Sequence, residues 1–148
     1  MKTAIINSDS FEKHNTGDGH PEQPKRVIAI KEKLKKRKDL IWAKPVTVPD
    51  DILTMTHSKK YIDNLKNSFP KKGLYFLDGD TVISPDSKKA VFEAAGSTIR
   101  AIDGIESNQF KNAFCLARPP GHHAEKNKAM GFCCISNAGV ATNYLVLK

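Results

Sequence analysis

The 148-residue sequence has few cysteines and no long apolar run, and these absences exclude several classes of protein. Its three cysteines, Cys115, Cys133 and Cys134, are odd in number and show no C-x-x-C spacing, which excludes a disulfide framework and a zinc ribbon. No stretch of about 18 apolar residues is present, so no transmembrane helix is expected. The first residues lack the apolar core of a secretory signal peptide, and we therefore expect a cytoplasmic protein.

Aromatic residues are also scarce, at 7% of the chain, whereas positive charge is in excess and gives a net charge of +8. Eight Lys and Arg residues lie between Lys25 and Lys38, with Glu32 as the one acidic residue among them. Val27 and Leu34 recur at helical spacing there, which predicts an amphipathic helix with a basic face. That face is either simply solvated or meets an acidic partner. Because no aromatic side chains are interleaved with these lysines, nucleic acid is not the expected partner.

The remaining composition is ordinary for a globular domain, with 39% hydrophobic and 27% charged residues. Apolar runs at 3–7 and 113–117 predict strands, the second one buried on both faces, and 41–48 predicts an edge strand because it contains Pro45. Strands that alternate with helices predict an α/β fold with a partial parallel sheet flanked by helices. The predicted helices are a basic helix over 25–38, a short helix opening at Pro49, one capped by Ser58, a long one over 85–105 and a last one over 137–148 that begins at an Asn cap.

The ligand site is expected at the carboxyl ends of the strands, where parallel sheets bind ligands. Two segments leave strands in this way, 8–24 and 118–132, and both are rich in His, Gly and Pro. No stop signal follows the last helix, and three strands would leave an open sheet edge. We therefore expect residues 1–148 to be an incomplete portion of a larger domain, or else a chain that associates with itself through that edge.

The segment Arg118-Pro-Pro-Gly-His-His-Ala124 carries the strongest chemical signal. Two prolines stiffen the loop, and it presents two adjacent imidazoles, His122 and His123, side chains that can serve as a general acid and base. The alternative without a catalytic role is a polar surface loop that contains two histidines by chance. Metal ligation together with Cys133 and Cys134 is a weaker one, because the spacing matches no zinc pattern and buried structural cysteines are commoner.

The motif RPPGHHA, followed by Gly131-Phe132-Cys133 and Asn137, resembles the histone deacetylase and acetylpolyamine amidohydrolase superfamily. Three other stretches agree with that family in order and spacing: His14-x-x-Gly-x-x-His-Pro-Glu-x-Pro-x-Arg26, His57-Ser58-x-x-Tyr61-Ile62, and Asp80-Thr81 followed by Ser84-Pro85. The similarity covers nearly the whole chain. It implies the amino-terminal part of an arginase/deacetylase-like three-layer α/β/α fold.

The resemblance also implies roles for individual residues. His122 and His123 match the tandem acid/base pair beside a zinc-bound water, and His123 matches the residue that deprotonates the water and protonates the leaving amine. Gly131 matches a residue whose carbonyl receives the substrate amide, and Phe132 an aromatic wall of the acyl channel. Arg26 matches a basic residue near the channel floor, and Asp80 an acidic residue at the rim that grips the substrate.

The family's zinc ligands lie in an Asp-x-His segment and a later Asp, and neither is present in these 148 residues. Zinc is therefore implied for the complete family domain, with its ligands outside this sequence. Three hypotheses follow: the acid/base part of a zinc-dependent deacetylase of acetyl-lysine, acetylpolyamine or a similar amine; a non-catalytic basic binding module; and a truncated deacetylase-like protein that associates with itself.

Overall fold

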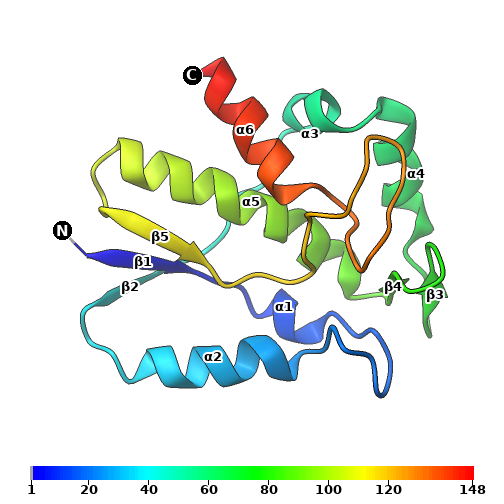
Figure 1. The fold of residues 1–148 in the computed structure, drawn as a ribbon, viewed down its shortest axis with the longest axis horizontal. Helices are drawn as coiled ribbons and strands as arrows, with labels where there is room; N and C mark the ends of the chain where they lie inside the picture. The colour runs from blue at the N-terminus through cyan, green and yellow to red at the C-terminus, as the bar shows by residue number, and fades with distance from the viewer. Residues whose placement is uncertain (1) are drawn as a thin grey trace.

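The computed structural model describes residues 2–148, which form three layers with a parallel sheet in the middle (Figure 1). Strands β1 (Thr3–Ile6), β2 (Leu40–Ala43) and β5 (Asn112–Cys115) make up the sheet in the order β2-β1-β5. Both pairings are parallel, and Thr3 lies opposite Leu40 on one side and Asn112 on the other. The predicted α/β architecture is therefore confirmed. Within the described residues β2 lies at the edge of this sheet, as expected, but it ends at Ala43 and does not include Pro45.

Helices cover both faces of the central strand. On one face, Ile5 packs with Val27 and Leu34 of α2 (Lys25–Lys35). On the other, Ala4 and Ile6 face α5 (Ser87–Glu106). Successive strand residues point to opposite faces, which explains why a strand covered on both sides reads as a nearly continuous apolar run.

Helix α5 lies close to its neighbours because its inner stripe is made of small residues. A Cβ added at Gly96 would lie 1.9 Å from the carbonyl oxygen of Val46, so only glycine permits this approach. The stripe also contains Ala90, Ala94 and Ala95, all buried. Ala95 belongs to the cluster that contains Val46 and Val48 of the connection after β2, whereas Ala90 and Ala94 belong to the cluster that contains Ile5 of β1.

The remaining elements frame the carboxyl ends of the strands. Ser58 caps α4 by accepting a hydrogen bond from the Tyr61 amide at 3.2 Å, as predicted. The last helix begins at Asn137, but Ser136 is its cap, because the Ser136 hydroxyl accepts from the Gly139 amide. No helix within residues 2–148 is long and apolar enough to cross a membrane. The other elements are α1 (Ser10–Lys13), α3 (Asp50–Thr56), α4 (Lys59–Ser68), the hairpin of β3 (Tyr75–Phe76) with β4 (Val82–Ile83), and α6 (Asn137–Leu147).

Strand β5 differs from the prediction. A strand over 113–117, buried on both faces, was expected, but β5 spans 112–115 and pairs only with β1 within the described residues. Phe114 is 48% exposed. Phe114 points to the face opposite Ala113 and Cys115, and the described residues cover only the latter face of β5 well. Sequence pattern alone does not show which elements cover each face. Self-association through this edge stays a prediction.

Candidate active site

The order of the strands creates a switch point between β1 and β5. The chain leaves β1 toward β2 on one side and reaches β5 on the other, with α2 and α5 on opposite faces (Figure 1). Ligands in open α/β sheets bind in the crevice at such a point, beyond the carboxyl ends of the strands. Here the connections that follow the two strands, 7–24 and 116–136, meet at that end.

A cavity of about 450 Å³ opens between these two connections. The structure brings together in it all six residues singled out from the sequence, and their roles stay predictions. Two more residues from the first connection complete the lining. The wall is formed by Pro21, Glu22, Arg26, Asp80, His122, His123, Gly131 and Phe132.

The two imidazoles lie side by side at the wall of this cavity. The ring centroids of His122 and His123 are 4.2 Å apart, with the planes tilted by 53°, and both residues are exposed. Gly121, just before them, is buried: a Cβ there would lie 2.5 Å from the Asn137 amide nitrogen and from the Ile135 carbonyl oxygen. The loop is therefore seated against the start of α6, while His122 and His123 stay exposed.

Gly131 and Cys133 hold His123 from the other side. Gly131 has a φ of 57°, and a Cβ there would lie 2.7 Å from the His123 Cδ2 atom. The His123 amide lies 3.5 Å from the Cys133 sulfur, and that thiol lies 3.2 Å from the Gly131 carbonyl oxygen, to which it donates. Glycine is thus required at position 131 by both the backbone angle and the adjacent ring.

Phe132 is held in an unusual backbone conformation at the cavity wall. Its φ is 70°, a region that bulky residues rarely adopt and that is typical of functional sites. Its amide donates to the Thr81 hydroxyl at 3.1 Å, and its ring contacts His20 edge-on, with centroids 4.9 Å apart. His20 Nε2 lies 3.1 Å from the carbonyl oxygen of Asp80. These contacts connect Phe132, through His20, to the turn that carries Asp80.

The sequence interpretation missed a buried ion pair beneath the cavity. Arg118 is completely buried and donates from Nε and Nη2 to the two carboxylate oxygens of Glu22, at 2.7 Å each. Its Nη1 donates to the carbonyls of Phe11 and His14. Arg26, mostly exposed, reaches the same carboxylate at 3.4 Å. The sequence did contain one indication of this pair. Glu22 and Arg118 carry opposite charges and lie in the two proline-containing segments that follow neighbouring strands.

His14 is also part of this buried group. Its Nδ1 lies 2.6 Å from the Ser87 hydroxyl, and its Nε2 lies 3.7 Å from a Glu22 oxygen. Burial and the nearby Arg118 charge lower its pKa to about 4, although Glu22 opposes them. His14 is therefore neutral at pH 7 and serves as a structural polar group.

A second buried histidine, His57, makes hydrogen bonds to both ends of the segment 125–136, which follows the tandem histidines. Its Nε2 accepts from the Ser136 amide at 3.0 Å, so Nδ1 carries the hydrogen and donates to the Glu125 carbonyl at 2.8 Å. Burial lowers its pKa, which favours this neutral tautomer. This histidine entered the sequence interpretation only as part of the family resemblance, and the structure shows that it hydrogen-bonds both ends of residues 125–136.

The cysteines do not form a metal centre with these histidines. Cys133 and Cys134 are buried and free, as expected of structural cysteines. Burial raises the pKa of both thiols. Within residues 2–148 there is no group of three or more His, Cys, Asp or Glu side chains placed to hold a metal ion. The described residues therefore do not fit a zinc site.

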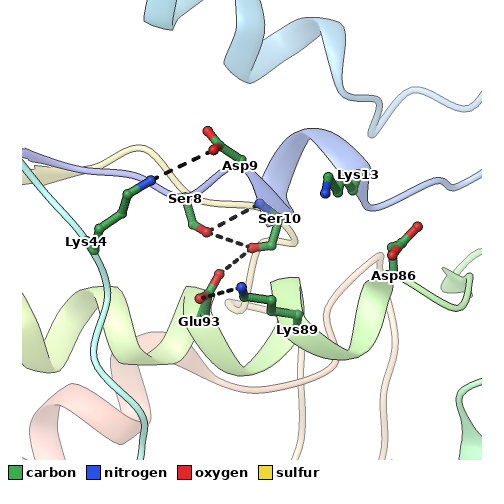
Figure 2. A pocket seen from close by; sticks show the side chains of 8 residues that line it. All are labelled: Ser8, Asp9, Ser10, Lys13, Lys44, Asp86, Lys89 and Glu93. Carbon is green, nitrogen blue, oxygen red and sulfur yellow. Dashed lines mark hydrogen bonds and ion pairs between the residues drawn. The ribbon is translucent and has the colours of Figure 1, made fainter.

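A second cavity, of about 400 Å³, lies between α1 and the first turns of α5 (Figure 2). Its three lysines and three carboxylates cancel in charge, and several of them contact one another: Lys89 lies 3.9 Å from Glu93, and Lys44 lies 4.0 Å from Asp9. Ser10 donates to Glu93 at 2.5 Å. None of the residues singled out from the sequence lies here, so this cavity is not the candidate site. It is lined by Ser8, Asp9, Ser10, Lys13, Lys44, Asp86, Lys89 and Glu93.

Comparison with known proteins identifies the family of the chain. The family model described as the histone deacetylase domain matches residues 20–148. The protein slr0245 of Synechocystis is 39% identical over 98% of this chain, and Histone deacetylase 5 of Arabidopsis thaliana is 30% identical over 98%. The crystal structure of the HDA15 HD domain superposes with a TM-score of 0.87, at 29% identity over 95% of this chain.

The matched region is only part of each relative. The chain covers 49% of the Synechocystis protein, 24% of the Arabidopsis protein and 42% of the HDA15 chain. It therefore spans about half, or less, of the length of these relatives. Because the family model covers most of the chain and the fold agrees, the chain belongs to the histone deacetylase family.

Proposed function

We propose that this chain forms the proton-transfer half of a deacetylase active site that acts on an acetylated amine, such as acetyl-lysine or an acetylpolyamine. The observation that carries the proposal is the single cavity at the switch point, whose wall contains His122, His123, Gly131, Phe132, Arg26 and Asp80 together. Family membership supports the reaction class, and the cavity supports the assignment of residues.

The paired imidazoles perform the acid and base steps. His123 accepts the proton of the attacking water and then donates it to the nitrogen of the departing amine, while His122 stabilises the charge that develops beside it. Their ring centroids are 4.2 Å apart, so one substrate group can lie beside both rings. Both residues are exposed, which leaves them accessible to a substrate.

The other lining residues bind and orient the substrate. Phe132 forms an aromatic wall for the aliphatic stem, and the Gly131 carbonyl accepts a hydrogen bond from the substrate amide. Asp80 lies at the rim, where a carboxylate attracts a cationic amine. Arg26 supplies positive charge near the channel floor.

Zinc and its ligands must come from outside residues 1–148, because the described residues hold no ligand set. We therefore assign no step of this chain to the metal. An apolar hollow of about 340 Å³ beside the open side of β5 reaches His122 and is lined by Cys115, Ala117 and Asn137 among others. This hollow supports the interpretation that the rest of the domain joins the chain there.

Reconstitution tests the proposal. The 148-residue chain alone should release no acetate from an acetyl-lysine peptide or from N-acetylputrescine, with or without zinc. The same chain combined with the carboxyl-terminal half of the Synechocystis relative should release acetate in the presence of zinc. His123→Asn should then lower kcat by about 100-fold or more, while Glu12→Gln, at a residue that does not line the cavity, should leave it unchanged. Acetate release by the chain alone, or a fully active His123→Asn variant, would contradict the assignment.

A further inference from the structure

Glu22 lies where three parts of the candidate site meet. It is only 2% exposed, yet it belongs to the wall of the cavity that holds the two imidazoles. Its carboxylate receives two hydrogen bonds from Arg118 and one from Arg26. His14 faces the same carboxylate at 3.7 Å. One carboxylate thus joins the first connection, helix α2 and the tandem-histidine loop.

The backbone of Glu22 takes part in the same junction. Its carbonyl oxygen accepts from the Thr16 hydroxyl at 2.6 Å and from Arg118 Nη2 at 3.2 Å. Its amide donates to His20 Nδ1 at 3.1 Å, and His20 is the ring that contacts Phe132. A shift of Glu22 would therefore also displace the tandem-histidine loop and the Phe132 ring.

The link from Glu22 to the imidazoles is short and stiff. Arg118 is followed by Pro119 and Pro120, whose rings fix φ, and then by Gly121, which is seated against the start of α6. His122 comes next. The loop is thus clamped at Arg118 by Glu22 and at Gly121 by α6, with the imidazoles directly beyond the second clamp.

Stability alone is a poor explanation for burying this pair. Replacing a buried ion pair by apolar residues of similar size is often neutral or stabilising, because desolvation offsets the attraction between the charges. What a bidentate arginine–carboxylate contact provides is geometry, since two parallel N–H···O bonds fix both the distance and the plane of the guanidinium. That geometry sets where the tandem-histidine loop begins.

We propose that Glu22 is a positioning residue of the candidate active site: through Arg118 it fixes the tandem-histidine loop, and directly it holds Arg26 at the cavity wall. The inference rests on the proposed function for its importance, but its geometry can be tested without any deacetylase activity. Glu22 itself transfers no proton and touches no reacting atom.

Histidine-ring NMR spectra of the 148-residue chain provide the test. In the wild type, His122 and His123 should give a cross-peak between their rings, as their 4.2 Å separation requires. Glu22→Gln should shift both ring signals and remove that cross-peak. Glu22→Asp keeps the charge on a shorter stem and should largely restore it. Glu12→Gln, which loses a partly buried ion pair with Lys31 and does not line the cavity, is the matched control and should leave the His122 and His123 signals unchanged.

Glu22→Gln leaves the buried Arg118 charge without its partner and can unfold the chain, so a second variant is needed. Glu22→Met combined with Arg118→Met removes both charges and should fold, yet lose the ring cross-peak in the same way. A folded variant of either kind with wild-type ring signals would overturn the proposal, as would Glu22→Asp spectra identical to those of Glu22→Gln. Failure of the double variant to fold would assign the pair to stability alone and also overturn it. None of these outcomes depends on whether the reconstituted domain deacetylates its substrate.

Discussion

Acid should destabilise this chain through His14 well before it protonates ordinary carboxylates. The folded state keeps His14 neutral because burial and the Arg118 charge lower its pKa to about 4, whereas in the unfolded chain it titrates near 6.5. As the pH falls below about 6.5, the unfolded state binds a proton that the folded state does not. Stability linked to this group is therefore complete above about pH 7 and is lost as the pH falls toward 4.

The size of the effect follows from the two pKa values. A fall from 6.5 to about 4 corresponds to about 3 kcal/mol of unfolding free energy, of which about 2 kcal/mol is lost by pH 5. Because His14 is almost completely buried, solvent screening reduces this figure little. For a domain of this size, whose total stability is on the order of 5–15 kcal/mol, such a loss is easily measured.

Urea unfolding followed by the fluorescence of Trp42, the one tryptophan in the sequence, measures the effect at fixed ionic strength between pH 7 and pH 5. His14→Asn keeps a hydrogen-bonding group near Ser87 but does not titrate. The difference in unfolding free energy between wild type and His14→Asn should shrink by about 2 kcal/mol over this range. His122→Asn, at an exposed position, is the control and should follow the wild-type curve. Parallel curves for wild type and His14→Asn would refute the reasoning.

Three further predictions concern the loops, helix ends and thiols. Gly131→Ala introduces a methyl group against a ring at positive φ and should cost about 1–2 kcal/mol in thermal unfolding, whereas Gly79→Ala, which has open space at its Cβ, should cost less than about 0.5 kcal/mol. Ser136→Ala removes the cap of α6 and should cost about 1 kcal/mol in urea unfolding, with Ser136→Asp restoring stability. Burial raises the pKa of Cys115 to about 11 and that of Cys134 further, so Ellman's reagent at pH 8 should label the folded chain slowly and all three thiols after denaturation. Rapid labelling of the folded chain would contradict this burial.

Local patterns in the sequence were enough to place the main elements of the fold. The apolar run at 3–7 became β1, the small-residue stripe of 85–105 became α5, and Ser58 capped α4. Each of these depends on neighbouring residues alone. The meeting of 8–24 with 118–132 also followed, because parallel strands bring their carboxyl ends to one edge.

Features that depend on distant partners were not predictable in the same way. Residues 10–13 form α1 inside the segment 8–24, where no helix was expected, and the β3–β4 hairpin was not predicted. Glu22 and Arg118 are 96 positions apart, and no local pattern pairs them. The open side of β5 likewise depends on which strands are its neighbours, whereas its sequence reports only that it is apolar.

The buried polar side chains that support the cavity differ from the two exposed imidazoles to which we assign the proton transfers. His14, Arg118 and His57 are buried and hydrogen-bonded, whereas His122 and His123 are exposed and contribute few contacts to the fold. Loss of a buried polar partner leaves an unsatisfied group and lowers stability, but loss of an exposed imidazole does not. The pH dependence of unfolding therefore reports on the support, and reconstituted activity reports on the tandem histidines. Ring spectra connect the two, because they detect the exposed imidazoles while the change is made in the buried pair.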